Sequence, residues 1–155
     1  MRIRVVAVGT RMPSWVSDGV YEYHKRLPRD FTVDWLEIPP AKRSGEQPEA
    51  LKAKEAAAIT RQLKADNRLV ALDVAGEIIS TEKLASRFQQ WQMEPQPLTI
   101  IIGGPDGLSD GLLSQADQCW SLGRITLPHP LVRVILAEQL YRAWSINANH
   151  PYHRA

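Results

Sequence analysis

Cysteine is nearly absent from this 155-residue chain, which contains Cys119 and no other thiol. A single cysteine excludes an intrachain disulfide, and four scattered histidines without paired cysteines are a poor zinc site, so we predict no metal. Long apolar runs are also missing. No window approaches the ~20 residues that span a bilayer, and the opening MRIRVVAVGT is not followed by a small-residue cleavage site. We expect a cytoplasmic protein with no membrane partner.

A large excess of charge is lacking as well, because the net charge is only +2. That value does not by itself indicate a nucleic-acid binder. The distribution is uneven, however: residues 1–43 carry 8 basic and 5 acidic side chains, residues 44–119 carry 7 and 11, and residues 120–155 carry 4 and 1. A polyanion-binding surface would therefore use the carboxyl-terminal segment, with or without the amino-terminal one; ordinary solvated charge is the alternative.

Apolar runs of strand length alternate with stretches of helical periodicity, which is typical of βαβ units and a parallel sheet. The predicted strands are residues 3–8, 31–38, 69–74, 98–102 and 120–127. LVALDV and LTIII are almost unbroken apolar runs and predict central strands, whereas Phe31, Val33 and Trp35 alternate with polar residues as in an edge strand. The length suits a single α/β domain, residues 1–155, with helices on both faces of the sheet.

Helix starts can be recognised between these strands. Ser80 and Ser109 are predicted N-caps, and Pro130 suits the first turn of a helix over residues 131–146. This last helix is apolar around most of its circumference and must be covered on more than one side, for which a second subunit is a natural partner. The proline-rich segment 39–48 predicts a loop, either a plain surface connection or an RNA contact.

Open parallel sheets bind ligands beyond the carboxyl ends of their strands, so the loops after the strands are the candidate sites. AGE (75–77), GGPDGLSDG (103–111) and PHP (128–130) occupy such positions. The second has four glycines but matches neither common phosphate-binding pattern, so by itself it fits a tight turn as well as a small-molecule site. His129 between two prolines indicates either a rigid turn or a functional loop. The ending NHPYHRA offers Tyr152 for base stacking and Arg154 for a phosphate.

The segments LDVAG, IIGGPDGLS, LPHPLVRVILAEQLYRAWS and NHPYHR, in this order, resemble the RlmH family of ribosomal RNA large-subunit methyltransferases. These are the smallest members of the SPOUT superfamily, and MRIRVVAVGTRMPSWV extends the resemblance over essentially the whole chain. The resemblance implies a carboxyl-terminal trefoil knot, a homodimer, and S-adenosyl-L-methionine as cofactor. It places the cofactor against Leu72, Gly103, Leu122, Gly123, Arg124, Ile125, Thr126 and Leu127.

The resemblance further implies methyl transfer to N3 of a pseudouridine in the large ribosomal RNA, within an assembled subunit or ribosome. Transfer to this nitrogen requires removal of its proton. His153, His129 and Asp106 are candidate acceptors, with His153 favoured, although the family has glutamate as often as aspartate at the position of Asp106. Arg154 would stabilise the developing charge on the base or bind a phosphate. The predicted RNA-binding residues are Arg133, Tyr152 and Arg154.

Two other readings remain open. A flavodoxin-like protein would share the βαβ pattern but would bind flavin or a nucleotide. A ribosome-associated protein with the same fold and no catalytic activity would bind ribosomes without transferring a methyl group.

Overall fold

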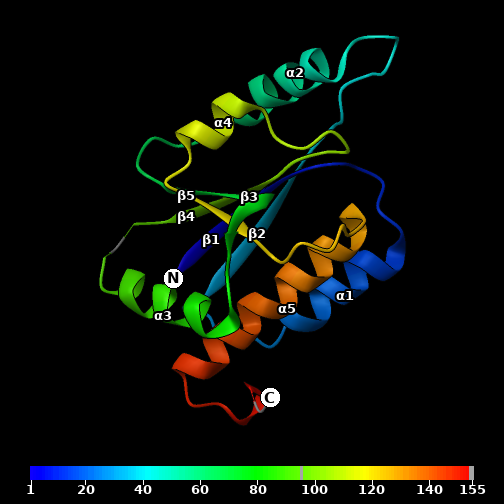
Figure 1. The fold of residues 1–155 in the computed structure, drawn as a ribbon. Coiled ribbons are helices and arrows are strands. Elements are labelled where there is room, and N and C mark those ends of the chain that lie inside the picture. The colour runs from blue at the N-terminus through cyan, green and yellow to red at the C-terminus, as the bar shows by residue number, and fades with distance from the viewer. Residues whose placement is uncertain (95, 154–155) are drawn as a thin grey trace.

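Five parallel strands form one sheet in the order β2-β1-β4-β3-β5 within the described part of the chain (Figure 1). The computed structural model describes residues 1–94 and 96–153. The strands are β1 (Arg2–Val8), β2 (Thr32–Ile38), β3 (Arg68–Ile78), β4 (Leu98–Ile102) and β5 (Gln118–Ser121). The α/β class and the parallel sheet are confirmed, and the trefoil knot stays a prediction.

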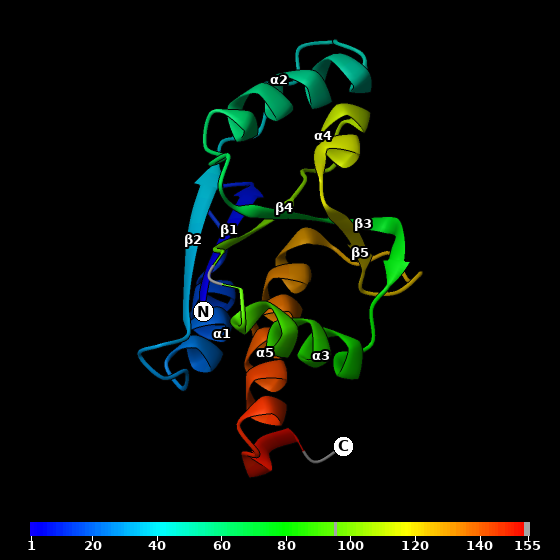
Figure 2. The ribbon, with the colours of Figure 1, turned by 90° about the vertical axis from the view of Figure 1, so that its left-hand side faces the viewer.

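Helices cover both faces of this sheet. They are α1 (Ser14–His24), α2 (Pro48–Thr60), α3 (Thr81–Gln92), α4 (Asp110–Gln115) and α5 (His129–Asn147), followed by the short 3-10 helix η1 (Pro151–His153). Figures 1 and 2 show α1, α3 and α5 on one face, with α2 and α4 on the other. Each face has its own apolar cluster: Ile100 of β4 belongs to one, and its neighbour Ile101 to the other. This division follows from the alternation of side chains along a strand.

The positions of the strands agree with their sequence patterns. All five residues of β4 are buried, and β3 lies between β4 and β5, so the two continuous apolar runs are interior strands as predicted. The alternating β2 is at an edge of the sheet. Ser80 and Ser109 accept hydrogen bonds from the backbone amides of Lys83 and Leu112, which confirms both predicted N-caps.

Two predicted boundaries are wrong near the carboxyl ends of the strands. β5 ends at Ser121, not at residue 127, because the Ser121 hydroxyl donates to the Gly123 carbonyl at 2.8 Å and turns the chain out of the sheet. The φ angle of Gly123, +137°, favours glycine at this turn. Conversely, residues 75–77 are not a loop, because β3 continues to Ile78 and pairs again with β5 after a bulge.

The apolar circumference of α5 is largely covered by the chain itself. α1 and α3 both pack along α5. On the side that faces the sheet, Leu136, Leu140 and Ala143 are buried in the same apolar cluster as residues of the strands. Leu131, in the first turn, remains 40% exposed. Much of the apolar pattern therefore reflects intrachain packing, and the predicted homodimer needs a separate argument.

His24, at the end of α1, makes stability sensitive to acid. Its Nε2 accepts a hydrogen bond from the Trp35 indole at 2.7 Å, so the folded state requires a neutral ring. Burial lowers the pKa of His24 to about 4, although nearby Asp34 opposes the shift. The unfolded chain therefore takes up the proton first, and stability present above about pH 6.5 is lost as pH falls toward 4.

Replacing His24 by glutamine tests this coupling. The glutamine oxygen can still accept from Trp35 but does not titrate. We expect chemical denaturation to show a smaller loss of unfolding free energy between pH 7 and pH 4.5 in His24→Gln than in the parent. Parallel pH curves for the two proteins would contradict this assignment.

Candidate functional site

A cavity of about 510 Å³ opens beyond the carboxyl ends of β3, β4 and β5. Small-molecule sites typically enclose about 300–1,000 Å³, and this edge of an open parallel sheet is where they form. Four segments build the wall: the end of β3, the glycine loop (residues 103–109), the exit loop (residues 122–128) and the start of α5. Among the predicted cofactor residues, those that line the cavity are Leu72, Gly103, Leu122, Gly123, Ile125, Thr126 and Leu127.

The glycine loop presents main chain to the cavity. The Gly107 amide donates to the Gly104 carbonyl at 2.9 Å and closes a turn with Pro105 at its second position. Gly107 has a φ of +83°, which favours glycine. At Gly103 the constraint is space, because an added Cβ would lie 2.7 Å from the Gly107 carbonyl carbon. The loop thus folds back on Gly103 itself.

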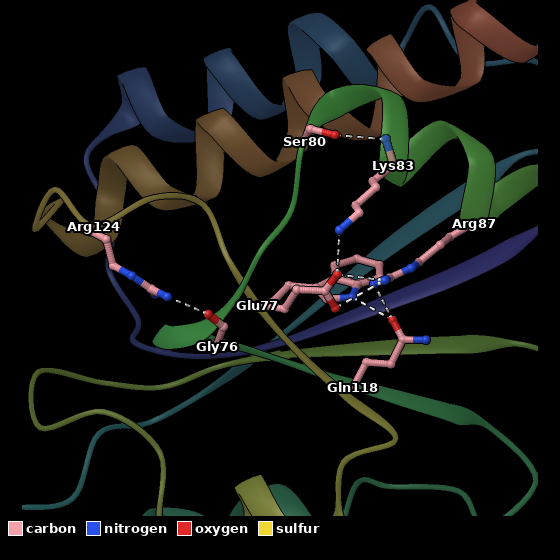
Figure 3. Close-up of polar contacts among 8 residues, drawn as sticks. Gly76, Glu77, Ser80, Lys83, Arg87, Gln118 and Arg124 are labelled. Atoms are coloured by element: carbon pink, nitrogen blue, oxygen red, sulfur yellow. Dashed lines mark hydrogen bonds and ion pairs between the residues drawn. The ribbon is translucent and has the colours of Figure 1, made fainter.

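Arg124 does not line the cavity, unlike its neighbours in the exit loop. Its guanidinium donates to the Gly76 carbonyl at 3.1 Å (Figure 3). It also donates to the Val74 carbonyl. The side chain thereby fastens the exit loop to the end of β3. Arg124 supports the cavity wall from outside, where the sequence had predicted a direct cofactor contact.

A polar network holds the end of β3 against α3 (Figure 3). Glu77 pairs with Lys83 at 3.1 Å and with Arg87 at 2.9 Å. Arg87 also donates to the Gln118 side-chain oxygen, which accepts in addition from the Trp120 indole at 2.8 Å. Partly exposed ion pairs add little stability singly. The network instead orients Trp120, which lines the cavity. Arg87 holds Gln118, and Gln118 in turn holds the Trp120 indole.

Gly104, Pro105, Gly107 and Pro128 also line the cavity, and they lie in two of the loops that the sequence marked as candidate sites. The sequence did not predict the other lining residues, which are Asp73, Val74, Ile102, Trp120 and Val132. Asp73 carried a usable signal, because it is the polar residue near the end of a buried apolar run. Trp120 and Val132 carried none, since a cavity-lining apolar side chain has the same sequence pattern as a core residue.

His129 lies at the cavity, where α5 begins. Its Nδ1 is 3.2 Å from the Gly103 carbonyl oxygen, and its Nε2 accepts from the Arg133 Nε at 2.8 Å. Burial, and then the adjacent Arg133 charge, lower the pKa of His129. The ring therefore stays neutral and bridges α5 to the glycine loop.

Arg133 is buried, with only 4% of its surface exposed. Besides His129, its guanidinium contacts Glu37 at 2.6 Å and the Gly9 carbonyl at 2.9 Å. Arg133 was predicted to bind RNA, yet its donors already have partners inside the protein. The structure therefore does not place it where an RNA phosphate would meet it.

Tyr152 and His153 lie beyond the far end of α5, in η1 (Figure 2). The Tyr152 hydroxyl donates to Glu138 at 2.9 Å, and Arg142 lies 5.0 Å from the ring centroid. Burial, together with the Glu138 contact, raises the pKa of Tyr152 to about 12. His153 has a buried Nδ1 with no hydrogen-bond partner among the described residues. Arg154 lies outside the described residues.

The tail residues and the cavity are well separated within one chain. α5 has 19 residues, which at ~1.5 Å per residue separate its ends by about 28 Å. His129 is at the cavity end, whereas η1 folds back along α5 from the other end, and the Tyr152 hydroxyl reaches only as far as Glu138, nine residues or ~14 Å from His129. Asp106 is in the glycine loop, but its carboxylate is paired with Arg43 at 2.6 Å. A single chain thus brings His129 to the cavity but not the tail candidates.

Residues 1–153 match a family model described as a predicted SPOUT methyltransferase. A protein of Chromohalobacter salexigens is 52% identical over 99% of this chain and its own full length. A second, from Saccharophagus degradans, is 50% identical over 99% of this chain and again its own full length. Both bear the name ribosomal RNA large subunit methyltransferase H.

Solved structures support the same fold at much lower identity. A probable methyltransferase from Bordetella pertussis aligns with a TM-score of 0.60 at 15% identity, covering 92% of this chain and 93% of that one. A probable methylase family protein from Haemophilus influenzae gives 0.58, also at 15% identity, over 99% and 70%. At such identities the likeness concerns the fold alone.

Proposed function

The chain belongs to the SPOUT methyltransferase family, and we propose that it transfers a methyl group from S-adenosyl-L-methionine to large-subunit ribosomal RNA. The acceptor in this proposal is N3 of a pseudouridine, presented by an assembled large subunit or ribosome. The observation that carries the proposal is the cavity at the strand ends, whose wall contains seven of the eight residues predicted to hold the cofactor. The relatives' names supply the ribosomal substrate.

The chemistry of the cavity fits the cofactor. Leu72, Leu122 and Leu127 provide apolar wall for an adenosine, while the glycine and exit loops provide backbone donors and acceptors. Asp73 adds a carboxylate that can accept from hydroxyl or ammonium groups. When bound, S-adenosyl-L-methionine supplies an electrophilic methyl group on a sulfonium. The protein then has to hold this group in line with the acceptor nitrogen and exclude water.

The proton on the acceptor nitrogen needs a base, and the geometry favours a group from outside the cavity's own chain. The acceptor nitrogen of His129 is occupied by Arg133, and Asp106 is paired with Arg43. His153 remains, together with Tyr152 to stack the base and Arg154 to stabilise its charge. Because α5 separates these residues from their own cavity, we propose that they serve the cavity of a partner subunit in a homodimer.

The homodimer is tested by mass in solution. Sedimentation equilibrium at micromolar concentration should give about twice the chain mass of 17.5 kDa. A dimer is expected because the tail of a single chain reaches back only to Glu138, which is ~14 Å along α5 from His129 at the cavity. An active monomer would contradict the shared site.

Recognition of a shaped ribosomal surface agrees with the weak net charge of +2. Nonspecific affinity for free RNA depends on the number of phosphates that basic side chains neutralise. A protein with a small net charge neutralises few phosphates and should bind free RNA weakly. We therefore propose the ribosome or its large subunit as partner.

Transfer of labelled methyl groups tests the proposed function. The protein is incubated with methyl-labelled S-adenosyl-L-methionine and ribosomes from a strain that lacks the modification. We expect one label per ribosome, at N3 of one pseudouridine. A ribosome-binding protein without activity would bind these particles and transfer nothing. A flavodoxin-like protein would bind flavin or a nucleotide and leave the cofactor in solution.

A further inference from the structure

A continuous chain of polar contacts runs from the end of β2 to the glycine loop through the start of α5. Glu37 accepts from Arg133 Nη1 at 2.6 Å, Arg133 Nε donates to His129 Nε2 at 2.8 Å, and His129 Nδ1 lies 3.2 Å from the Gly103 oxygen. Arg133 also donates to the Gly9 carbonyl, just beyond β1. One histidine–arginine pair on α5 thus connects the ends of β1, β2 and β4.

The arginine fixes the protonation of the histidine. The Nε of an arginine always carries hydrogen and never accepts, so Nε2 of His129 has to be the accepting nitrogen. A neutral ring then has its hydrogen on Nδ1, from which it donates to the Gly103 carbonyl. Both ring nitrogens are engaged, and no lone pair remains to remove a proton from a substrate.

The buried charge of Arg133 explains why the chain of contacts includes Glu37. An unpaired guanidinium at 4% exposure would be strongly destabilising, and the Glu37 carboxylate and Gly9 carbonyl offset its desolvation. The approach is tight at Gly9, where an added Cβ would lie 3.2 Å from Arg133 Nη2. Arg133 is therefore held in one orientation, with its Nε directed at His129.

We infer that His129 is a positioning residue and not a proton acceptor: together with Arg133 and Glu37, it fixes the Gly103 carbonyl and hence the shape of the cavity. This inference rests on the proposed function for its kinetic consequences but not for its structural ones. The backbone of Gly107 and Leu108 lies so close to Gly103 that an added Cβ would be within 2.9 Å of it, so the position of Gly103 and its carbonyl constrains this part of the glycine loop. Cofactor affinity, not the rate of the chemical step, should depend on His129.

Two amide substitutions separate the two ring nitrogens. In His129→Asn the amide nitrogen can occupy the place of Nδ1 and donate to Gly103, while the acceptor for Arg133 is lost. In His129→Gln the longer side chain can place its oxygen near Nε2 to accept from Arg133, while the donor to Gly103 is lost. Neither variant contains a titratable base.

We expect His129→Gln to weaken cofactor binding about 3- to 10-fold, the usual value of one hydrogen bond, and His129→Asn to stay within about 3-fold of the parent. At saturating cofactor, the turnover of both should remain within about tenfold, with an unchanged pH profile. If His129 were the proton acceptor, both would lose about 10²- to 10⁴-fold in turnover at unchanged cofactor affinity. That result would overturn the inference.

Hydrogen exchange of the glycine loop tests the same inference without cofactor or ribosomes. Amides of residues 103–109 should exchange about 3- to 10-fold faster in His129→Gln than in the parent, and at nearly the parental rate in His129→Asn. Equal exchange in all three proteins would refute the positioning role even if methyl transfer is never detected. A parent that binds no cofactor would instead refute the proposed function. Thermal melts of each variant establish that it is folded.

Discussion

Substituting valine for Gly103 should severely weaken cofactor binding, because the glycine loop has no space for a side chain there. An added Cβ would lie 2.7 Å from the Gly107 carbonyl carbon and 2.9 Å from the Leu108 nitrogen. Both are backbone atoms, which cannot rotate away as a flexible side chain can. The loop has to open, and even Gly103→Ala should lower the free energy of unfolding by about 1–3 kcal/mol, as overpacking does.

Calorimetric titration with S-adenosyl-L-methionine measures the functional effect. Gly103→Val should weaken binding on the order of 100-fold or more, which corresponds to about 2.7 kcal/mol. Gly111→Ala is the matched control, because its Cβ would meet only the Ser109 hydroxyl, at 4.0 Å. Gly111 lies within α4, so alanine there should preserve binding and favour the helix slightly. A folded Gly103→Val protein with parental affinity would move the cofactor site elsewhere.

Deleting residues 152–155 should lower methyl transfer by orders of magnitude while cofactor affinity survives. The deletion removes the stacking ring of Tyr152, the favoured base His153 and the charge of Arg154, but it touches no residue that lines the cavity. Loss of base positioning and charge stabilisation acts on the transition state, so turnover falls and cofactor binding does not. Radiolabel transfer and calorimetry on the same protein measure the two effects.

Tyr152→Phe is the control for this deletion. It removes the hydroxyl bonded to Glu138 but keeps the ring, which lies 4.6 Å from that of Tyr141, so its effect on transfer should be mild. His153→Ala should be partly rescued at high pH if His153 removes the N3 proton, because hydroxide can replace it. Full transfer by the truncated protein would show that the tail has no part in the chemistry.

Mixed dimers test whether the tail serves the partner's cavity. A heterodimer can be formed from one truncated subunit and one Gly103→Val subunit. The truncated subunit has the only intact cavity, and the Gly103→Val subunit has the only intact tail. If the tail acts across the dimer, mixing should restore activity that neither homodimer has. If the tail acts within its own chain, the mixture should remain inactive.

The sequence correctly predicted the structural features that depend on a local pattern of residues. Unbroken apolar runs identified the interior strands β3 and β4, alternation identified the edge strand β2, and Ser80 and Ser109 were correctly read as caps. The glycine-rich segment after β4 was also correctly placed at a ligand-sized cavity. These features are set by residues close together in the chain.

Features set by tertiary contacts were not predictable. Leu122, Ile125 and Leu127 made residues 120–127 resemble a strand, but their apolar side chains line a cavity after the Ser121 turn. The position of the Arg124 side chain was not predictable for the same reason, because only the fold brings the Gly76 carbonyl within its reach. The sequence also could not distinguish a buried Arg133 from a surface one, since its partners Glu37 and Gly9 are 96 and 124 residues away along the chain.

A crystal structure with S-adenosylhomocysteine, the demethylated cofactor product, tests the central claim most directly. We predict that it occupies the cavity between the glycine loop and the exit loop, against Leu72 and Gly103, with the His129–Gly103 contact retained. Its sulfur should face the tail of a partner subunit. Density for the ligand at any other site, with this cavity empty, would contradict the account.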